Sequence, residues 1–262
     1  MATEDGAKGW SAQQYLRFEG ERTRPSRDLL AQVGLQRARR VVDVGCGPGN
    51  STQLLVERFP EAVVMGVDTS KDMLQHARER LPGCTFLEAD LVRWAPPEDT
   101  DLLFANAVLQ WIPDHQRVMQ QMLEALPEGG VLAVQMPDNT REPAHLLMQE
   151  VARRDPWAEK LAKPGAVQTA LPDAASYYDE LKPLCRRVEI WHTVYEHVMD
   201  GPEAIVEWFM GSSLRPFVAA LDAGEGEAFL QAYGTEIAKA YPRSVDGKTL
   251  LPFPRLFVVA TR

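Results

Sequence analysis

The sequence has little cysteine: its 262 residues include only Cys46, Cys84 and Cys185. The three stand far apart, and no Cys-x-x-Cys pair or Cys/His cluster has the spacing of a zinc site. This usage indicates a reducing compartment. Nor does the chain contain a run of about 18 apolar residues, the length that a membrane-spanning helix requires. We therefore expect a cytoplasmic protein without a metal site.

The chain also lacks an excess of positive charge. Its 28 Lys and Arg stand against 37 Asp and Glu, for a net charge of −9. Because affinity for a phosphate backbone comes from clustered Lys and Arg, we do not expect nucleic acid as the partner. The 45% hydrophobic and 25% charged fractions are those of a globular protein and argue against a disordered or fibrous chain.

From residue 40 onward, short apolar runs alternate with amphipathic stretches, which predicts βαβ units. We expect an α/β fold: a seven-stranded, mostly parallel sheet flanked by helices, forming one domain over residues 1–262. A helical insertion over 200–250 precedes the last strand and lies over the end of the sheet. The predicted strands are 41–44, 63–67, 85–88, 101–105, 131–135, 188–195 and 256–260. The predicted helices are 50–58, 71–81, 114–126, 143–153, 202–210, 214–221 and 225–241.

The strongest local signal is a strand that runs directly into three alternating glycines, Gly45, Gly47 and Gly49, followed by a helix. Glycines here let the backbone approach a ligand and leave the free N–H groups of the helix start facing it. Asp43 stands two residues before the first glycine, where a carboxylate can hold an ammonium group. The alternative is a tight turn whose glycines serve geometry alone.

The dinucleotide fingerprint Gly-x-Gly-x-x-Gly is the nearest rival to this loop. Here the third glycine comes one residue early, Asn50 stands where the fingerprint has Gly or Ala, and Pro48 lies inside the loop. This spacing fits a nucleoside ligand without a pyrophosphate. Asp68 ends the second strand, where it can accept both hydroxyls of a ribose or, alternatively, cap a turn. Asp90, after the third strand, lies outside the dinucleotide pattern.

Taken together, the glycine loop with Asp43, Asp68, the Asp90-Leu91 pair and Asn106 resembles the cofactor site of the Rossmann-like methyltransferases. Each member alone is a weak signal, but the set is specific. The resemblance implies S-adenosyl-L-methionine as the cofactor and a Rossmann-like sheet. It also implies the three glycines beneath the methionine moiety, Asp68 on the ribose, Asp90 and Leu91 around the adenine, and Asn106 near the methionine end.

Stretches outside these motifs are similar to the trans-aconitate 2-methyltransferase family. They extend over nearly the whole chain, with least likeness at about 152–170; they are 10–18, 21–25, 106–115, 131–139, 214–216 and 253–257. The resemblance implies methylation of a carboxylate of trans-aconitate, a small tricarboxylic acid, and an insertion that covers this substrate. A carboxylate is already ionised near pH 7, so we expect no catalytic base.

Arginine is the residue best suited to bind the remaining carboxylates of such a substrate, because its planar fork pairs with them bidentately. The candidates are Arg22, Arg24, Arg215 and Arg255. Arg24 and Arg215 rank first because each stands beside proline and apolar residues. For every one of the four, the alternative is a solvated surface arginine.

Aromatic and amide side chains are candidates for the pocket wall. Those we assign to the substrate are Tyr15, Trp111 and Asn139, with Trp10, Gln110, Trp191 and Tyr195 as further members. Trp111 follows the fourth strand, where an aromatic ring can favour a sulfonium by cation–π attraction. For Trp191 or Tyr195, on one face of an alternating strand, the alternative is core packing.

Histidine is not expected to act as a base, since methyl transfer to a carboxylate removes no proton. His115 is predicted to face solvent at a helix start, and His192 lies on the sixth strand.

Four other functions remain open. A methyltransferase acting on a fatty acid, an amine or a phenol is disfavoured by the arginines, which suit a polyanion. A nucleic-acid methyltransferase is disfavoured because Asn106 precedes Ala107-Val108, without a Pro-Pro-aromatic run. The others are a nicotinamide-dependent oxidoreductase and a binding protein without catalysis.

Overall fold

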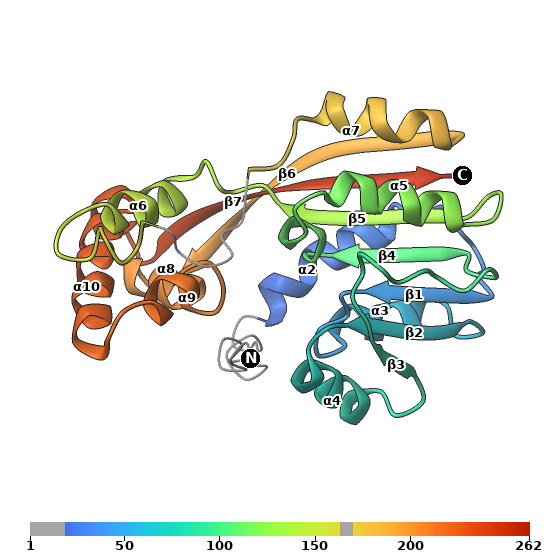
Figure 1. Ribbon diagram of the computed structural model, residues 1–262, viewed down its shortest axis with the longest axis horizontal. Coiled ribbons are helices and arrows are strands. Elements are labelled where there is room, and N and C mark those ends of the chain that lie inside the picture. Colours follow the sequence, from blue (N-terminus) through green and yellow to red (C-terminus); the bar gives the residue numbers. More distant parts are fainter. Residues whose placement is uncertain (1–18, 163–169) are drawn as a thin grey trace, which may run out of the picture. The chain divides into compact units, whose positions relative to one another are not determined.

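The structure of the protein, a computed structural model, describes residues 19–162 and 170–262 (Figure 1). They form two compact units. The sheet unit comprises the described residues up to Met136 together with Pro172–Trp191 and Leu256–Arg262. The helical unit comprises Pro137–Leu171 and His192–Arg255.

The seven strands form one sheet with the order β3-β2-β1-β4-β5-β7-β6. Their bounds are Arg40–Val44 (β1), Val63–Asp68 (β2), Thr85–Glu88 (β3), Leu102–Asn106 (β4), Val131–Pro137 (β5), Arg187–Met199 (β6) and Thr249–Thr261 (β7). β1 to β5 pair in parallel, and Figure 1 shows them as neighbouring arrows. The predicted mostly parallel sheet is therefore confirmed.

β7 runs against the direction of β5. The N–H of Arg262, at the end of β7, donates to the carbonyl of Gly130, which precedes β5. The N–H of Asp138, just after β5, donates to the carbonyl of Pro254 inside β7. Residue numbers thus fall along one strand as they rise along the other, which is the antiparallel arrangement.

The central strands consist of apolar runs because both faces of the sheet are covered. In β1, Val41, Val42 and Val44 are fully buried, and β4 is buried from Leu102 to Ala105. The strand that follows β1 in the chain, β2, lies on one side of this pair, and the strand that follows β4, β5, lies on the other side. Chain order therefore reverses between β1 and β4. Such a reversal opens a crevice at the carboxyl ends of the strands, which is the usual ligand position in α/β sheets.

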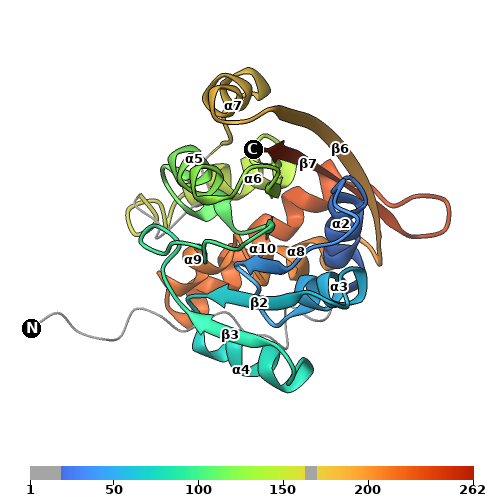
Figure 2. The same cartoon turned by 90° about the vertical axis from the view of Figure 1, so that its right-hand side faces the viewer.

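Helices follow the strands in turn. In the sheet unit they are α2 Glu19–Ala31, α3 Asn50–Arg58, α4 Lys71–Arg80, η1 Leu109–Trp111, α5 His115–Ala125, α7 Ala174–Leu181 and η2 Lys182–Leu184. In the helical unit they are α6 Pro143–Ala152, α8 Pro202–Met210, α9 Arg215–Ala219 and α10 Ala223–Ala240. α7 lies beside α5, and Gln116 Nε2 donates to Ser176 Oγ between them at 2.9 Å (Figure 2).

The sequence patterns do not predict the helices α2 and α7 or the full length of the strands β6 and β7. α2 is largely polar and contains Pro25, so its apolar period is weak, and α7 is short. The predicted bounds of β6 and β7 were too short, because both strands contain 13 residues. β7 includes Pro252 and Pro254, residues that ordinarily argue against a strand, and this obscured its first half.

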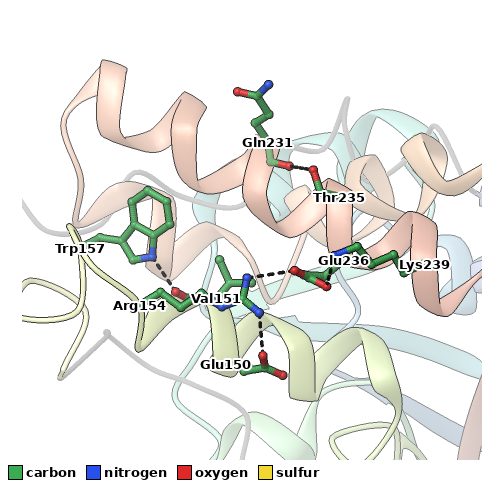
Figure 3. A network of polar contacts seen from close by, with 8 residues as sticks. All are labelled: Glu150, Val151, Arg154, Trp157, Gln231, Thr235, Glu236 and Lys239. Atoms are coloured by element: carbon green, nitrogen blue, oxygen red, sulfur yellow. Dashed lines mark hydrogen bonds and ion pairs between the residues drawn. The ribbon is translucent and has the colours of Figure 1, made fainter.

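The helical unit is held together by α10, which packs against α6 and α8. Arg154 joins α6 to α10: Nη2 contacts Glu150 at 2.6 Å and Nη1 contacts Glu236 at 3.0 Å (Figure 3). The indole N–H of Trp157 donates to the carbonyl of Val151 at 2.6 Å. This unit includes 137–171, 192–199 and 251–255 besides the predicted insertion. That residues 200–250 cover a substrate stays a prediction.

Across residues 19–162 and 170–262, no helix is long and apolar enough to cross a membrane. The same ranges contain no group of three or more His, Cys, Asp and Glu side chains that could hold a metal ion.

Candidate functional site

The glycine loop after β1 adopts a backbone that needs glycine. Gly45, Gly47 and Gly49 have φ angles of 70°, 52° and 89°, in the left-handed region that side chains disfavour. The N–H groups of Gly45 and Cys46 both donate to the carbonyl of Val67, at 2.7 Å and 3.0 Å. The loop is therefore anchored to the end of β2.

Asp68 at the end of β2 also binds this loop. Its Oδ2 accepts a hydrogen bond from the N–H of Gly47, and its Oδ1 accepts one from the N–H of Ser70, each at 2.9 Å. A carboxylate has about four lone-pair positions, so both oxygens keep capacity for another donor. The turn role that sequence reasoning gave as an alternative is thus present, and the ribose role stays a prediction.

Asp43 is fully buried beneath the loop. Its Oδ2 accepts hydrogen bonds from Ser51 Oγ at 2.7 Å and Thr52 Oγ1 at 2.6 Å, while Oδ1 has no partner among the described residues. Burial raises the pKa of this carboxyl to about 6, against the opposing effect of the two hydroxyl donors. Asp43 therefore positions the first turn of α3. Its predicted contact with an ammonium group stays untested.

The loop after β4 packs against the glycine loop. A Cβ atom on Gly45 would lie 2.3 Å from Val108 Cγ2, so only glycine fits there. Asn106, the last residue of β4, has a buried Oδ1 with no partner in the part of the chain that the structure describes. Sequence reasoning identified Asn106 but not the packing of Val108, because no local pattern marks a contact between distant loops.

Asp90 and Leu91 follow β3. Asp90 is exposed and its Oδ1 accepts a hydrogen bond from the N–H of Val92 at 3.0 Å, which closes a turn, whereas Leu91 is buried. Parallel strands present their carboxyl ends at one edge of a sheet, so the strand order brings all eight predicted cofactor residues to that edge of the sheet unit. They are Asp43, Gly45, Gly47, Gly49, Asp68, Asp90, Leu91 and Asn106.

The predicted substrate arginines differ in burial. The side chain of Arg24 is 69% exposed and lies 4.0 Å from Asp28, as a surface arginine would. Arg255 is only 3% exposed, and its guanidinium lies 4.6 Å from the ring centre of Phe253 and 5.8 Å from that of Tyr195. Arg255 is thus the most buried of the candidate arginines whose side chains the structure describes, and which of them bind the substrate stays a prediction.

The other substrate candidates are divided between the units. Arg215 begins α9 and is half-buried. Asn139 is buried, and its segment lies beside that of Arg255 because the N–H of Asp138 donates to the carbonyl of Pro254. Trp111 is half-buried in η1 of the sheet unit. Trp10, Tyr15 and the side chain of Arg22 lie outside the described part of the chain.

Of the two aromatic residues of β6, Tyr195 is a core residue, whereas Trp191 is half-buried. Trp191 stacks on Phe257 with ring centres 4.9 Å apart and an interplanar angle of 9°. Tyr195 is buried beside Arg255.

The expectation that His115 faces solvent is wrong. His115 is buried, and its Nε2 lies 2.6 Å from the hydroxyl of Tyr177 on α7. Burial lowers its pKa. The partner belongs to a helix that sequence reasoning missed, which explains the error. His192 is exposed, with its Nε2 3.0 Å from Asp138 Oδ2.

Comparison with known proteins identifies close relatives. A family model described as a methyltransferase domain matches residues 35–195. A trans-aconitate 2-methyltransferase of Rhodopseudomonas palustris (strain BisB18) is 60% identical over 253 residues, which cover 97% of this chain and 99% of the relative. A trans-aconitate 2-methyltransferase of Agrobacterium fabrum (strain C58 / ATCC 33970) is 52% identical with the same coverage.

Solved structures show the same fold at low identity. The YcgJ protein of Bacillus subtilis has a TM-score of 0.60 at 14% identity, over 91% of this chain and 99% of that one. Phosphoethanolamine N-methyltransferase 2 of Haemonchus contortus, in complex with S-adenosyl-L-methionine, has a TM-score of 0.55 at 17% identity, over 91% of this chain and 52% of that one.

Proposed function

Because this chain belongs to the trans-aconitate 2-methyltransferase family, we propose that it transfers a methyl group from S-adenosyl-L-methionine to a carboxylate of trans-aconitate. The products are the monomethyl ester and S-adenosylhomocysteine. The observation that carries the proposal is the 60% identity to such an enzyme over nearly the full length of both chains.

The residues at the carboxyl edge of the sheet fit this cofactor. The left-handed glycine loop leaves open space at Gly47, where a Cβ atom would meet no other atom within 4 Å. Buried acceptor oxygens without a partner among the described residues, Asp43 Oδ1 and Asn106 Oδ1, suit an ammonium donor. We propose that Asp68 binds the ribose, that Asp90 and Leu91 border the adenine, and that Asn106 lies near the methionine end.

When bound, S-adenosyl-L-methionine supplies a methyl group made reactive by its attachment to a sulfonium. The protein then needs no general base, since the acceptor carboxylate is ionised near pH 7. Its work is to hold the acceptor oxygen in line with the methyl carbon and to exclude water from the nucleophile. We accordingly assign no acid–base residue.

Arg255 is our first choice for binding the remaining carboxylates of the substrate. The guanidinium belongs to a residue that is 3% exposed and lies near the rings of Phe253 and Tyr195, so it is weakly solvated, which strengthens its pairing with a carboxylate. Asn139, on the neighbouring segment, offers a buried amide. Arg22, Arg24, Arg215, Tyr15 and Trp111 complete the proposed set, and we propose that residues 200–250 cover the substrate.

The remaining proposals concern the setting of this activity. The net charge of −9 supports a small-molecule substrate without a nucleic-acid partner, and the cysteine usage supports action in the cytoplasm.

Methyl transfer from labelled S-adenosyl-L-methionine tests the function directly. The acceptor panel comprises trans-aconitate, cis-aconitate, citrate, isocitrate and a fatty acid. We expect an ester on trans-aconitate; a protein that esterifies only the fatty acid would contradict the polycarboxylate assignment.

Cofactor binding is tested separately by thermal unfolding. A ligand that binds the native state raises its melting temperature, so S-adenosylhomocysteine should stabilise the protein and NAD should not. Asp68→Ala should abolish the shift with S-adenosylhomocysteine, whereas Asp72→Ala, an exposed change in the first turn of α4, should preserve it. An unchanged shift in Asp68→Ala would overturn the site.

A further inference from the structure

Ala107, directly after β4, has an unusual backbone. Its φ of 56° is the one positive value at a residue other than glycine in the described ranges. A side chain in this left-handed region costs roughly 1–3 kcal/mol and persists where the surroundings enforce it. Such strain is concentrated at ligand sites, and Ala107 lies at the carboxyl edge of the sheet.

Two hydrogen bonds hold Ala107 in this conformation. Its N–H donates to the carbonyl of Gln135 at 2.9 Å, which continues the pairing of β4 with β5. Its carbonyl accepts a hydrogen bond from Gln110 Nε2 at 2.8 Å. The first bond comes from the sheet itself. The second comes from a side chain, and Gln110 is therefore the replaceable part of the support.

The environment of Gln110 restricts it to this contact. The residue is 4% exposed, so its amide cannot turn toward solvent. Reversing the amide would set Oε1 against the carbonyl of Ala107, acceptor against acceptor. Oε1 is buried without a partner among the described residues, which makes Gln110 a costly choice for a purely structural position.

The strained turn has a direct effect on the next residue. Val108 follows Ala107, and its carbonyl accepts a hydrogen bond from the N–H of Trp111 at 3.1 Å. The Val108 side chain then packs on Gly45, where all three of its carbon atoms beyond Cα would lie within 2.3 to 2.9 Å of an added Cβ. The turn at Ala107 thus sets the position of the side chain that supports the glycine loop.

We propose that Gln110 is a positioning residue of the cofactor site. By fixing Ala107 in the left-handed conformation, Gln110 holds Val108 against Gly45 and so keeps the glycine loop in the shape that receives S-adenosyl-L-methionine. This inference rests on the proposed function for the identity of the ligand. Gln110 acts through Ala107 and Val108 and is not assigned a contact with the reacting atoms.

Gln110→Leu tests the proposal, with Gln116→Leu as the matched control. Both changes remove one side-chain hydrogen bond from the sheet unit, but that of Gln116 joins Ser176 on α7, away from the loop. The readouts are the Kd of S-adenosylhomocysteine by titration calorimetry, KM and kcat, and the melting temperature without ligand. We expect Gln110→Leu to raise the Kd roughly tenfold and Gln116→Leu to leave it within about twofold of the parent protein.

A second variant separates positioning from general destabilisation. Glycine adopts the left-handed conformation without penalty, so Ala107→Gly removes the need for support. In the Ala107→Gly background, Gln110→Leu should therefore raise the Kd of S-adenosylhomocysteine only slightly. The melting temperature should still fall, as it does when Gln110→Leu is made in the parent protein. An equal loss of affinity in both backgrounds, or no loss in either, would overturn the proposal. A parent protein that does not bind S-adenosylhomocysteine would instead refute the proposed function.

Discussion

The hydroxyl of Thr52 donates a 2.6 Å hydrogen bond to Oδ2 of Asp43, so a residue in the first turn of α3 is fixed to a carboxyl group inside β1. Ser51 makes the same contact at 2.7 Å. Two hydroxyl groups at the start of α3, directly after the glycine loop, are therefore hydrogen-bonded to the fully buried carboxyl group of Asp43.

Asp43 should make the stability of the protein fall as pH rises from about 4 to about 6. Its pKa is near 3.9 in the unfolded chain and about 6 in the folded one, so within this window only the unfolded state releases the proton. The loss amounts to about 3 kcal/mol in total, since each unit of pKa difference corresponds to about 1.4 kcal/mol. Urea unfolding of the parent and of Asp43→Asn at several pH values measures this effect. The difference between the two should change across the window; parallel curves would contradict the prediction.

His145 on α6 should make the stability of the protein rise with pH, which is the opposite of the effect of Asp43. It is buried against Phe209, and burial lowers its pKa to about 4 from an unfolded value near 6.5. Between these values only the unfolded state takes up a proton, so stability is lost as pH falls from about 6.5 to about 4. His145→Gln keeps a side-chain N–H for Ser213 but does not titrate. Its unfolding free energy should be less sensitive to acid than that of the parent in the same urea titrations; equal sensitivity would contradict the assigned cause.

Gly45→Ala should destabilise the protein by about 2 kcal/mol or more, because the new Cβ meets Val108 and the left-handed backbone disfavours alanine. Val108→Ala removes two of the three obstructing carbon atoms, Cγ1 and Cγ2, so the double variant should recover part of the loss, an interaction that a double-mutant cycle measures. Gly83→Ala, in open space, is the control. Purely additive effects of Gly45→Ala and Val108→Ala would mean that the two loops do not support one another.

Arg255→Met should raise KM for trans-aconitate by about 10- to 100-fold and change KM for a monocarboxylate acceptor much less, since one charge-assisted contact is worth about 1.5–3 kcal/mol. Methionine preserves much of the packing against Phe253 and Tyr195. Arg187→Met, at an exposed position of β6 outside the proposed set, should have a small effect on either acceptor. The same loss with both acceptors would assign Arg255 a structural role.

The glycine loop and the elements around it could be predicted closely from the sequence because their signals are local. Glycines at alternating positions, an acid at a strand end and an apolar run each show in a few consecutive residues, and α3 begins and ends at the predicted Asn50 and Arg58. Contacts between distant segments leave no such trace. The packing of Val108 on Gly45, the Tyr177 partner of His115 and the burial of Arg255 each depend on chain pairing that no local pattern encodes.

The thiol of Cys46 lies inside the glycine loop and is buried against Leu74, Ala77 and Phe86. Burial, together with the nearby carboxylates of Asp43 and Asp68, raises its pKa well above the usual range for cysteine. Because the thiolate is the reactive form, Cys46 resists alkylation and oxidation for as long as the loop keeps its shape. The rate at which a thiol reagent modifies Cys46 consequently measures how often the loop opens, and the measurement requires no added label.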